Sequence, residues 1–204
     1  GDTGKALVYA DAETNIFARG YLRGLVAALQ GKMEWARDEW WRVAREPYDV
    51  EKAGLADWLE AASRLDDTER VHRAVNDALE KFPGSPRLAL YQAIAYAKEG
   101  QLDDARRLAR AIAAAHEQGK IRRIRFVIEA DRWLIEQSIA DPEARDAMIE
   151  ALFTPPSAEE IDELAQVVPE DALLPDLAAG DELIDEIQAE AAAGIEPADE
   201  STEE

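Results

Sequence analysis

Apolar residues recur at three- and four-residue spacing along most of this chain, which is the period of one face of an α-helix. Ala, Leu, Arg, Glu and Ile dominate these stretches, and strand signals are nearly absent. Gly, Pro and Asp residues interrupt the pattern at the places where helices are expected to end. The pattern predicts helices at 14–30, 33–46, 51–64, 67–82, 86–99, 102–117, 120–139 and 142–153, and a helix fragment at 3–12.

The turns inside successive helix pairs recur at a nearly constant interval. Gly31, Asp66 and Gly100 are 35 and 34 residues apart. Short loops of this kind place consecutive helices antiparallel. A period near 34 with two helices per unit is typical of tetratricopeptide arrays. The alternative is an irregular helical bundle whose turns fall 34 residues apart by accident of helix length.

Small residues support the repeat interpretation, because two helices approach closely only where their side chains are small. In unit one, Gly24 holds the small position, and Ala36 followed by Trp40 matches the A-x3-aromatic step. Unit three has Ala93 and Ala105, whereas unit two carries larger side chains at these positions. Over 17–119, and to 153 if a fourth pair follows, the chain therefore resembles tetratricopeptide-repeat proteins. The expected fold is all-α: a short right-handed array of antiparallel helix pairs.

The resemblance also implies a binding surface. In that family the first helix of each unit lines the concave face, and on this alignment that face includes Glu60 and Arg64 beside mixed apolar and charged residues. Separately, Trp41 falls on the outer side of its helix and is a candidate aromatic anchor. The residues that we expect to bind a partner are Tyr21, Leu25, Trp41, Arg87, Leu90, Tyr91, Ile94 and Lys98.

Charge divides the chain into a nearly neutral body and an acidic tail. The sequence holds 44 acidic and 23 basic residues, a formal net charge of −21. The last basic residue is Arg145, and the 59 residues after it carry 19 of the acidic ones. We therefore expect a helical-repeat domain at 1–153 and an acidic tail at 154–204.

The tail has two short stretches with a helical pattern. Ser157 and Glu160 form a capping box, and Ile161, Leu164 and Val168 follow on one face. Asp181 can cap a second helix that ends at Gly194, with Leu183, Ile184 and Ile187 on its apolar face. Each is too short to be stable alone in water, so both are candidate docking segments.

The body offers a basic surface on which the tail could dock. Seven basic residues fall between Arg106 and Arg125, and Glu117 is the one acidic residue among them. The alternative is a solvated charged surface. The tail could dock on the basic surface of its own chain or on that of a second copy, which would give self-association, and the sequence leaves both open. The residues expected to take part are Arg106, Arg107, Arg110, Arg122, Arg123, Ile161, Leu164, Leu183 and Ile187.

Catalytic and metal chemistry find little support. The chain has no cysteine, and none of the common nucleophile, phosphate-loop, dinucleotide or zinc-protease motifs occurs. Glu69 and His72 form one E-x-x-H step, but a di-iron bundle needs two such motifs and two further glutamates. We expect no enzyme, no cofactor and no bound metal.

The partner that we expect is a protein or a peptide. The acidic balance disfavours nucleic acid, and no apolar run reaches the ~18 residues of a membrane span. The interpretation is a soluble protein–protein interaction scaffold, adaptor or assembly subunit. The alternatives are a secretion or assembly chaperone that masks a client segment, and an acidic mimic that binds a basic partner surface. The compartment stays open; we favour the cytoplasm over the periplasm, although a chain that begins at Gly1 is compatible with earlier removal of a signal peptide.

Overall fold

The computed structural model describes residues 3–50, 54–121, 123 and 125–167, and these residues form helices and no strands. The expected all-α class is therefore confirmed. In chain order the helices are α1 (Thr3–Ala12), α2 (Ile16–Leu29), α3 (Met33–Arg45), α4 (Leu55–Ser63), α5 (Thr68–Leu79), α6 (Pro86–Lys98), α7 (Leu102–Glu117), α8 (Arg125–Ser138), α9 (Pro142–Phe153) and α10 (Ala158–Val167).

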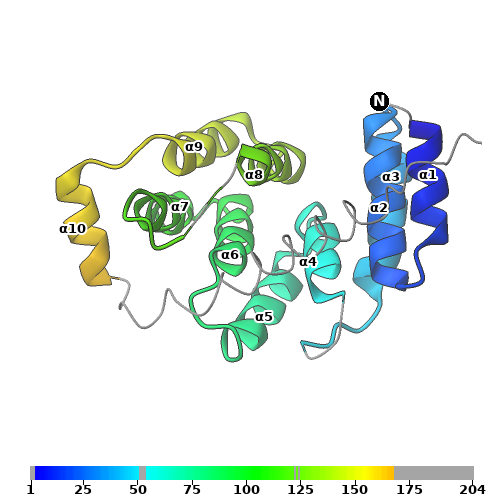
Figure 1. The fold of residues 1–204 in the computed structure, drawn as a ribbon, viewed down its shortest axis with the longest axis horizontal. Coiled ribbons are helices and arrows are strands. Elements are labelled where there is room, and N and C mark those ends of the chain that lie inside the picture. The colour runs from blue at the N-terminus through cyan, green and yellow to red at the C-terminus, as the bar shows by residue number, and fades with distance from the viewer. Residues whose placement is uncertain (1–2, 51–53, 122, 124, 168–204) are drawn as a thin grey trace, which may run out of the picture.

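The helices follow one another in a row, with α1 at one end and α10 at the other (Figure 1). The consecutive helices α2 and α3 pack together, as do α6 and α7, and α9 lies against α7. The pairs α2/α3, α4/α5, α6/α7 and α8/α9 are called units one to four below. None of the described helices is both long enough and apolar enough to span a bilayer.

Local chemistry sets many of the helix ends. The Asn15 side chain accepts hydrogen bonds from the backbone N–H groups of Phe17 and Ala18, at 2.9 and 3.3 Å, and so caps α2. Gly31 and Gly100 follow α2 and α6 with φ of +75° and +80°, a conformation that costs glycine little. The recurring turn residues in units one and three therefore have the same backbone role.

Helices α2 and α3 approach closely because glycines of α2 face larger side chains of α3. A Cβ atom on Gly24 would lie 2.2 Å from the Trp40 indole nitrogen, and one on Gly20 would lie 2.5 Å from a Val43 methyl carbon. Trp40 is in turn buried in the core. The small position predicted at Gly24 is thus one that a larger residue could not fill without displacing Trp40.

Two helix starts differ from the sequence prediction. The helix expected from 51 begins at Leu55 among the described residues, because Gly54 has a φ of +106° and cannot be part of a helix. The helix expected from 120 begins at Arg125. There Gly119 turns with a φ of +69°, and the N–H groups of Lys120 and Ile121 both bond back to the carbonyl of Ala115. Residues 120 and 121 therefore belong to the turn that ends α7 and not to the start of α8.

The first helix expected in the tail is confirmed as α10, and so is its capping box. The Ser157 N–H donates to the Glu160 carboxylate at 2.8 Å, and the Glu160 N–H donates to the Ser157 hydroxyl at 3.3 Å. The helix packs against α7. The second predicted tail helix, with Leu183, Ile184 and Ile187, lies outside the described residues, as does Val168.

Overpacking should test the close helix contacts. Ala36, Ala93 and Ala105 are all fully buried, as their predicted places at helix crossings require. Ala105→Leu adds three carbons where α7 has no free volume, so we expect its free energy of unfolding to fall by about 1–3 kcal/mol. Thermal and urea melts against Ala56→Leu, which places the same side chain at an exposed position, provide the measurement. Equal melting of both variants would show that Ala105 is not at a tight crossing.

Candidate functional site

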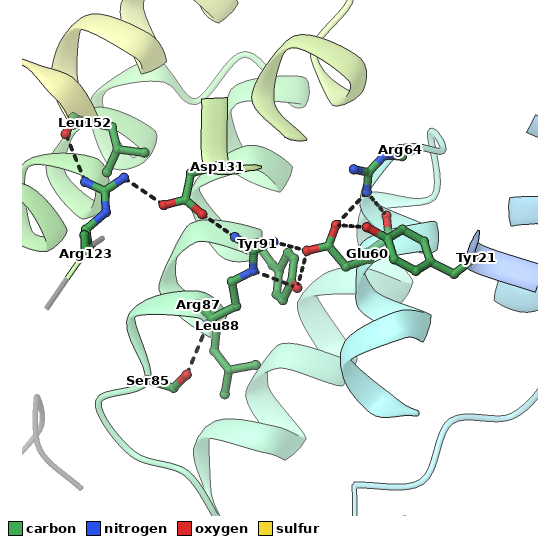
Figure 2. A network of polar contacts seen from close by, with 10 residues as sticks. All are labelled: Tyr21, Glu60, Arg64, Ser85, Arg87, Leu88, Tyr91, Arg123, Asp131 and Leu152. Carbon is green, nitrogen blue, oxygen red and sulfur yellow. Dashed lines mark hydrogen bonds and ion pairs between the residues drawn. The ribbon is translucent and has the colours of Figure 1, made fainter. Parts of the chain in front are cut away.

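A network of charged groups runs through the interior and joins helices from all four units (Figure 2). At its centre is Glu60 of α4, only 7% exposed. Its Oε2 accepts hydrogen bonds from the Tyr21 hydroxyl of α2 at 3.1 Å and from Arg64 Nη1 at 2.7 Å. Its Oε1 accepts from the Tyr91 hydroxyl of α6 at 2.8 Å and from Arg87 Nη2. Both carboxylate oxygens are therefore fully occupied.

The network continues from Arg87 to the last unit. Arg87 donates through Nε to the Tyr91 hydroxyl at 3.0 Å and through Nη1 to Asp131 of α8. The second oxygen of Asp131 accepts from Arg123 Nη2 at 2.7 Å, and Arg123 also reaches the carbonyl of Leu152 in α9. Asp131 is 4% exposed. Each buried carboxylate thus bridges two guanidinium groups from different places in the chain.

The Arg64 guanidinium group lies among three aromatic rings. Its guanidinium carbon lies 5.4 Å from the centroid of the Tyr21 ring and 5.3 Å from those of Trp40 and Trp133. Aromatic faces attract a cation most strongly where water is excluded, and Arg64 is 2% exposed. The rings of units one and four therefore help to hold this buried charge.

The ionisation of these groups follows from their neighbours. Burial alone would raise the pKa of the Glu60 carboxyl, but Arg87 and Arg64 outweigh burial and hold that pKa below its ordinary value. Burial, and then the Glu60 charge, raise the pKa of the Tyr21 and Tyr91 hydroxyls well above the ordinary range. Both tyrosines consequently remain protonated donors to an ionised Glu60.

The structure places the predicted groove residues in the core or in this network. Leu90, Tyr91 and Ile94 are at most 2% exposed, so the prediction that they line an open groove is wrong for these three. They face inward because α6 is covered by α5, α7 and α9. Leu25 is half-buried against the core. Tyr21 and Arg87 both donate hydrogen bonds to the Glu60 carboxylate, although part of the Arg87 side chain stays exposed.

Lys98, also predicted to line the groove, closes the end of another helix instead. Its ammonium group donates to the carbonyl oxygens of Ser63 and Leu65, where α4 ends, and lies 3.7 Å from Asp66. A cation at a helix C-terminus is favoured by the helix dipole. Burial lowers the pKa of Lys98 while Asp66 opposes that change. Lys98 therefore links α6 to α4 rather than facing a groove.

Trp41 is exposed as predicted, in contrast to its neighbour Trp40. Its side chain is 46% exposed on α3. It borders a shallow hollow together with Arg37, Leu65, Asp66 and Asp67. Trp41 remains a candidate anchor for a partner on the outer face of unit one.

The predicted basic surface divides into two parts. Arg110 of α7 holds α10: its Nη2 lies 2.7 Å from the Glu160 carboxylate and its Nη1 donates to the Thr154 carbonyl at 2.6 Å. Arg106 lines the same cleft between α7, α9 and α10, and Arg107 pairs with Asp104. The Arg123 side chain is buried against Asp131, so its predicted role in tail docking is wrong. Arg122 lies outside the described residues.

Ile161 and Leu164 are half-buried on α10. That burial agrees with apolar contact on α7.

The E-x-x-H step does not bring its two side chains to one metal position. Glu69 pairs with Arg73 on the surface at 2.8 Å, whereas the His72 ring stacks on Tyr96 with centroids 4.8 Å apart. Within the described part of the chain, no three metal-ligating side chains gather.

An apolar groove that the sequence did not predict lies where α5, α6 and α7 meet. Its walls come from the end of α5, the loop before α6, and one side each of α6 and α7, and they enclose a cavity of about 320 Å³. The residues around it are Leu79, Pro83, Gly84, Ser85, Pro86, Ala89, Gln92, Leu108, Ala111 and Ile112. Phe82, next to Pro83, is 47% exposed.

A second, smaller apolar pocket continues from this groove, because Pro86 and Ile112 border both. Val127 of α8 lies on its far wall and is 36% exposed. Arg87, Arg123 and Asp131 line the pocket as well, so the apolar surface leads to the charged network. The groove and pocket together, from Leu79 to Val127, are called the α5–α8 groove below.

Comparison of the chain with models of protein families, with curated proteins and with solved structures finds no match. Function therefore has to be argued from the geometry of these surfaces.

Removal of one buried carboxylate should be far more costly than removal of an exposed one. Glu60→Gln leaves Arg64 and Arg87 without their shared counter-charge, and we expect the free energy of unfolding to fall by about 3–5 kcal/mol. The control is Glu69→Gln, which removes a surface pair that should contribute less than about 1 kcal/mol. Urea unfolding followed by circular dichroism measures both. Similar values for the two variants would contradict the assignment of Glu60 as the centre of the network.

The same pair of proteins should differ in acid. Because the folded pKa of Glu60 lies below its ordinary value of 4.5, its ionisation stabilises the fold fully above that pH. The stabilisation is lost as the pH falls through the folded pKa. The stability gap between the wild type and Glu60→Gln should therefore be constant near neutral pH and shrink below about pH 4. Urea titrations across this range measure the gap, and a gap independent of pH would contradict the pKa direction.

Proposed function

We propose that this chain is a protein–protein interaction scaffold or adaptor, built as a right-handed tetratricopeptide-like array, that binds an apolar peptide or helix of a partner. The observation that carries the proposal is the α5–α8 groove, an apolar cavity open to solvent. An amphipathic helix or peptide with apolar anchors matches such a groove.

The charged network supports binding rather than catalysis. Its carboxylates and guanidiniums pair with one another inside the fold, and both tyrosines donate to Glu60. A catalytic group would need to face a substrate with a proton or lone pair to offer. We therefore propose that the network shapes the concave side and holds the groove-forming helices in place.

The runner-up is a chaperone that masks an apolar segment of a client, because an apolar groove suits that task equally well. The two differ in the lifetime of the complex. A scaffold should stay bound at equal stoichiometry, whereas a chaperone should release its client when the client is secreted or assembled.

Blocking the groove tests the proposal directly. Ala89→Glu places a charge on its α6 wall, and we expect captured partners to fall at least about tenfold, because each unpaired buried charge costs several kcal/mol. Immobilised full-length protein, native extract and quantitative mass spectrometry measure capture. Ala12→Glu, the same change on an exposed residue of α1, is the control. An unchanged partner set in Ala89→Glu, with its thermal melt also unchanged, would overturn the groove as the binding site.

A further inference from the structure

We infer that the α5–α8 groove is covered, in the resting protein, by the chain's own C-terminal segment 181–194, which a partner must displace. This inference rests on the proposed function of the groove and names its regulation. The segment carries Leu183, Ile184 and Ile187 on one helical face. Five of its other eleven residues are acidic. It has the amphipathic form that the groove requires.

The path from α10 to the groove is short. α10 lies on α7, and α7 also supplies the groove residues Leu108 and Ile112. In Figure 1 the C-terminal end of α10 and the loop between α5 and α6 lie on the same lower side of the molecule. The sixteen residues that follow Val167, up to and including Leu183, can span roughly 50 Å when extended, several times the ~10–12 Å diameter of one helix. The segment can therefore reach the groove within its own chain.

Charge favours the same placement. Residues 168–204 hold 13 acidic side chains and no basic one, whereas α7 exposes Arg106 and Arg107. Arg110 of this helix already takes an acidic side chain of the tail, Glu160, at 2.7 Å. Arg106 and Arg110 line the cleft beside α9 and α10 and not the groove, so their charge holds the tail on α7. Arg107, which directly precedes the groove residue Leu108, keeps 57% of its side chain exposed.

Tethering makes docking within one chain the favoured arrangement. Residues 168–180 tether the segment to α10, and a tether of this length gives an effective concentration in the mM range, far above the concentration of a second copy in dilute solution. A helix of 14 residues is marginal by itself in water, so the segment gains order mainly where its apolar face is covered. Exposed ion pairs contribute only about 0–1 kcal/mol each. The apolar face must therefore supply most of the affinity, and a partner with a longer apolar face can displace the segment.

Cross-linking in the full-length protein tests the inference, and the absence of native cysteine makes it clean. Gln92→Cys in the groove wall is combined with Ile187→Cys, and disulfide formation in dilute solution is followed on non-reducing gels. The control pair is Asp38→Cys, exposed on α3, with Ile187→Cys. We expect the groove pair to form an intramolecular disulfide at least about tenfold faster than the control, as its higher local concentration requires. Equal rates would overturn the inference, and a disulfide-linked dimer would place the segment on a second copy instead.

A second measurement separates this inference from the proposed function. Leu183→Glu combined with Ile187→Glu should release the groove and raise partner capture, whereas Ile195→Glu, outside the segment, should leave capture unchanged. Where Ala89→Glu should lose partners, this double variant should gain them. If Ala89→Glu abolishes capture while the double variant captures no more than the wild type, the groove binds partners and only the covering segment is wrong. If the cross-link forms but Ala89→Glu captures normally, the segment docks and the proposed function is wrong.

Discussion

The fold depends on the pairing of two buried carboxylates, Glu60 and Asp131, with three arginines, of which Arg87 keeps part of its side chain exposed. An unpaired charge in such a place would cost several kcal/mol, so each of these groups needs its partner in the folded state. Glu60 forms ion pairs with Arg64 and Arg87, and Asp131 forms ion pairs with Arg87 and Arg123. Because the partners come from α4, α6 and α8, the pairing fixes how those helices face one another. Tyr21 extends the same constraint to α2.

The secondary structure could be predicted because its causes are local. The glycine after α2, the proline that opens α9 and the Ser157–Glu160 capping box act within a few residues, and each lies where the sequence pattern put it. The start of α8 could not be predicted in this way. It depends on Gly119 adopting a positive φ and on two further N–H groups returning to Ala115, a choice that apolar spacing does not encode.

The site was predictable only in part, for a physical reason. Helical spacing and the resemblance put Glu60, Arg64 and Arg87 on related faces, and the structure brings them together. The sequence did not show that Asp131, 44 residues after Arg87, would neutralise that face and allow it to be buried. The apolar groove was missed for the opposite reason. Leu79 and Leu108 have the spacing of core residues, and only the meeting of three helix surfaces leaves room between them.

The charged network has a consequence for how such a chain can change in length. Arrays of helix pairs commonly vary by gain or loss of whole units, since each unit contacts only its neighbours. Here a helix pair inserted between α4 and α6, or between α6 and α8, would separate Arg87 from Glu60 or from Asp131 and remove one ion pair of the interior. The ion pairs therefore fix which helices must be neighbours, so this chain should tolerate substitutions on its surface more readily than the insertion of a helix pair between α4 and α8.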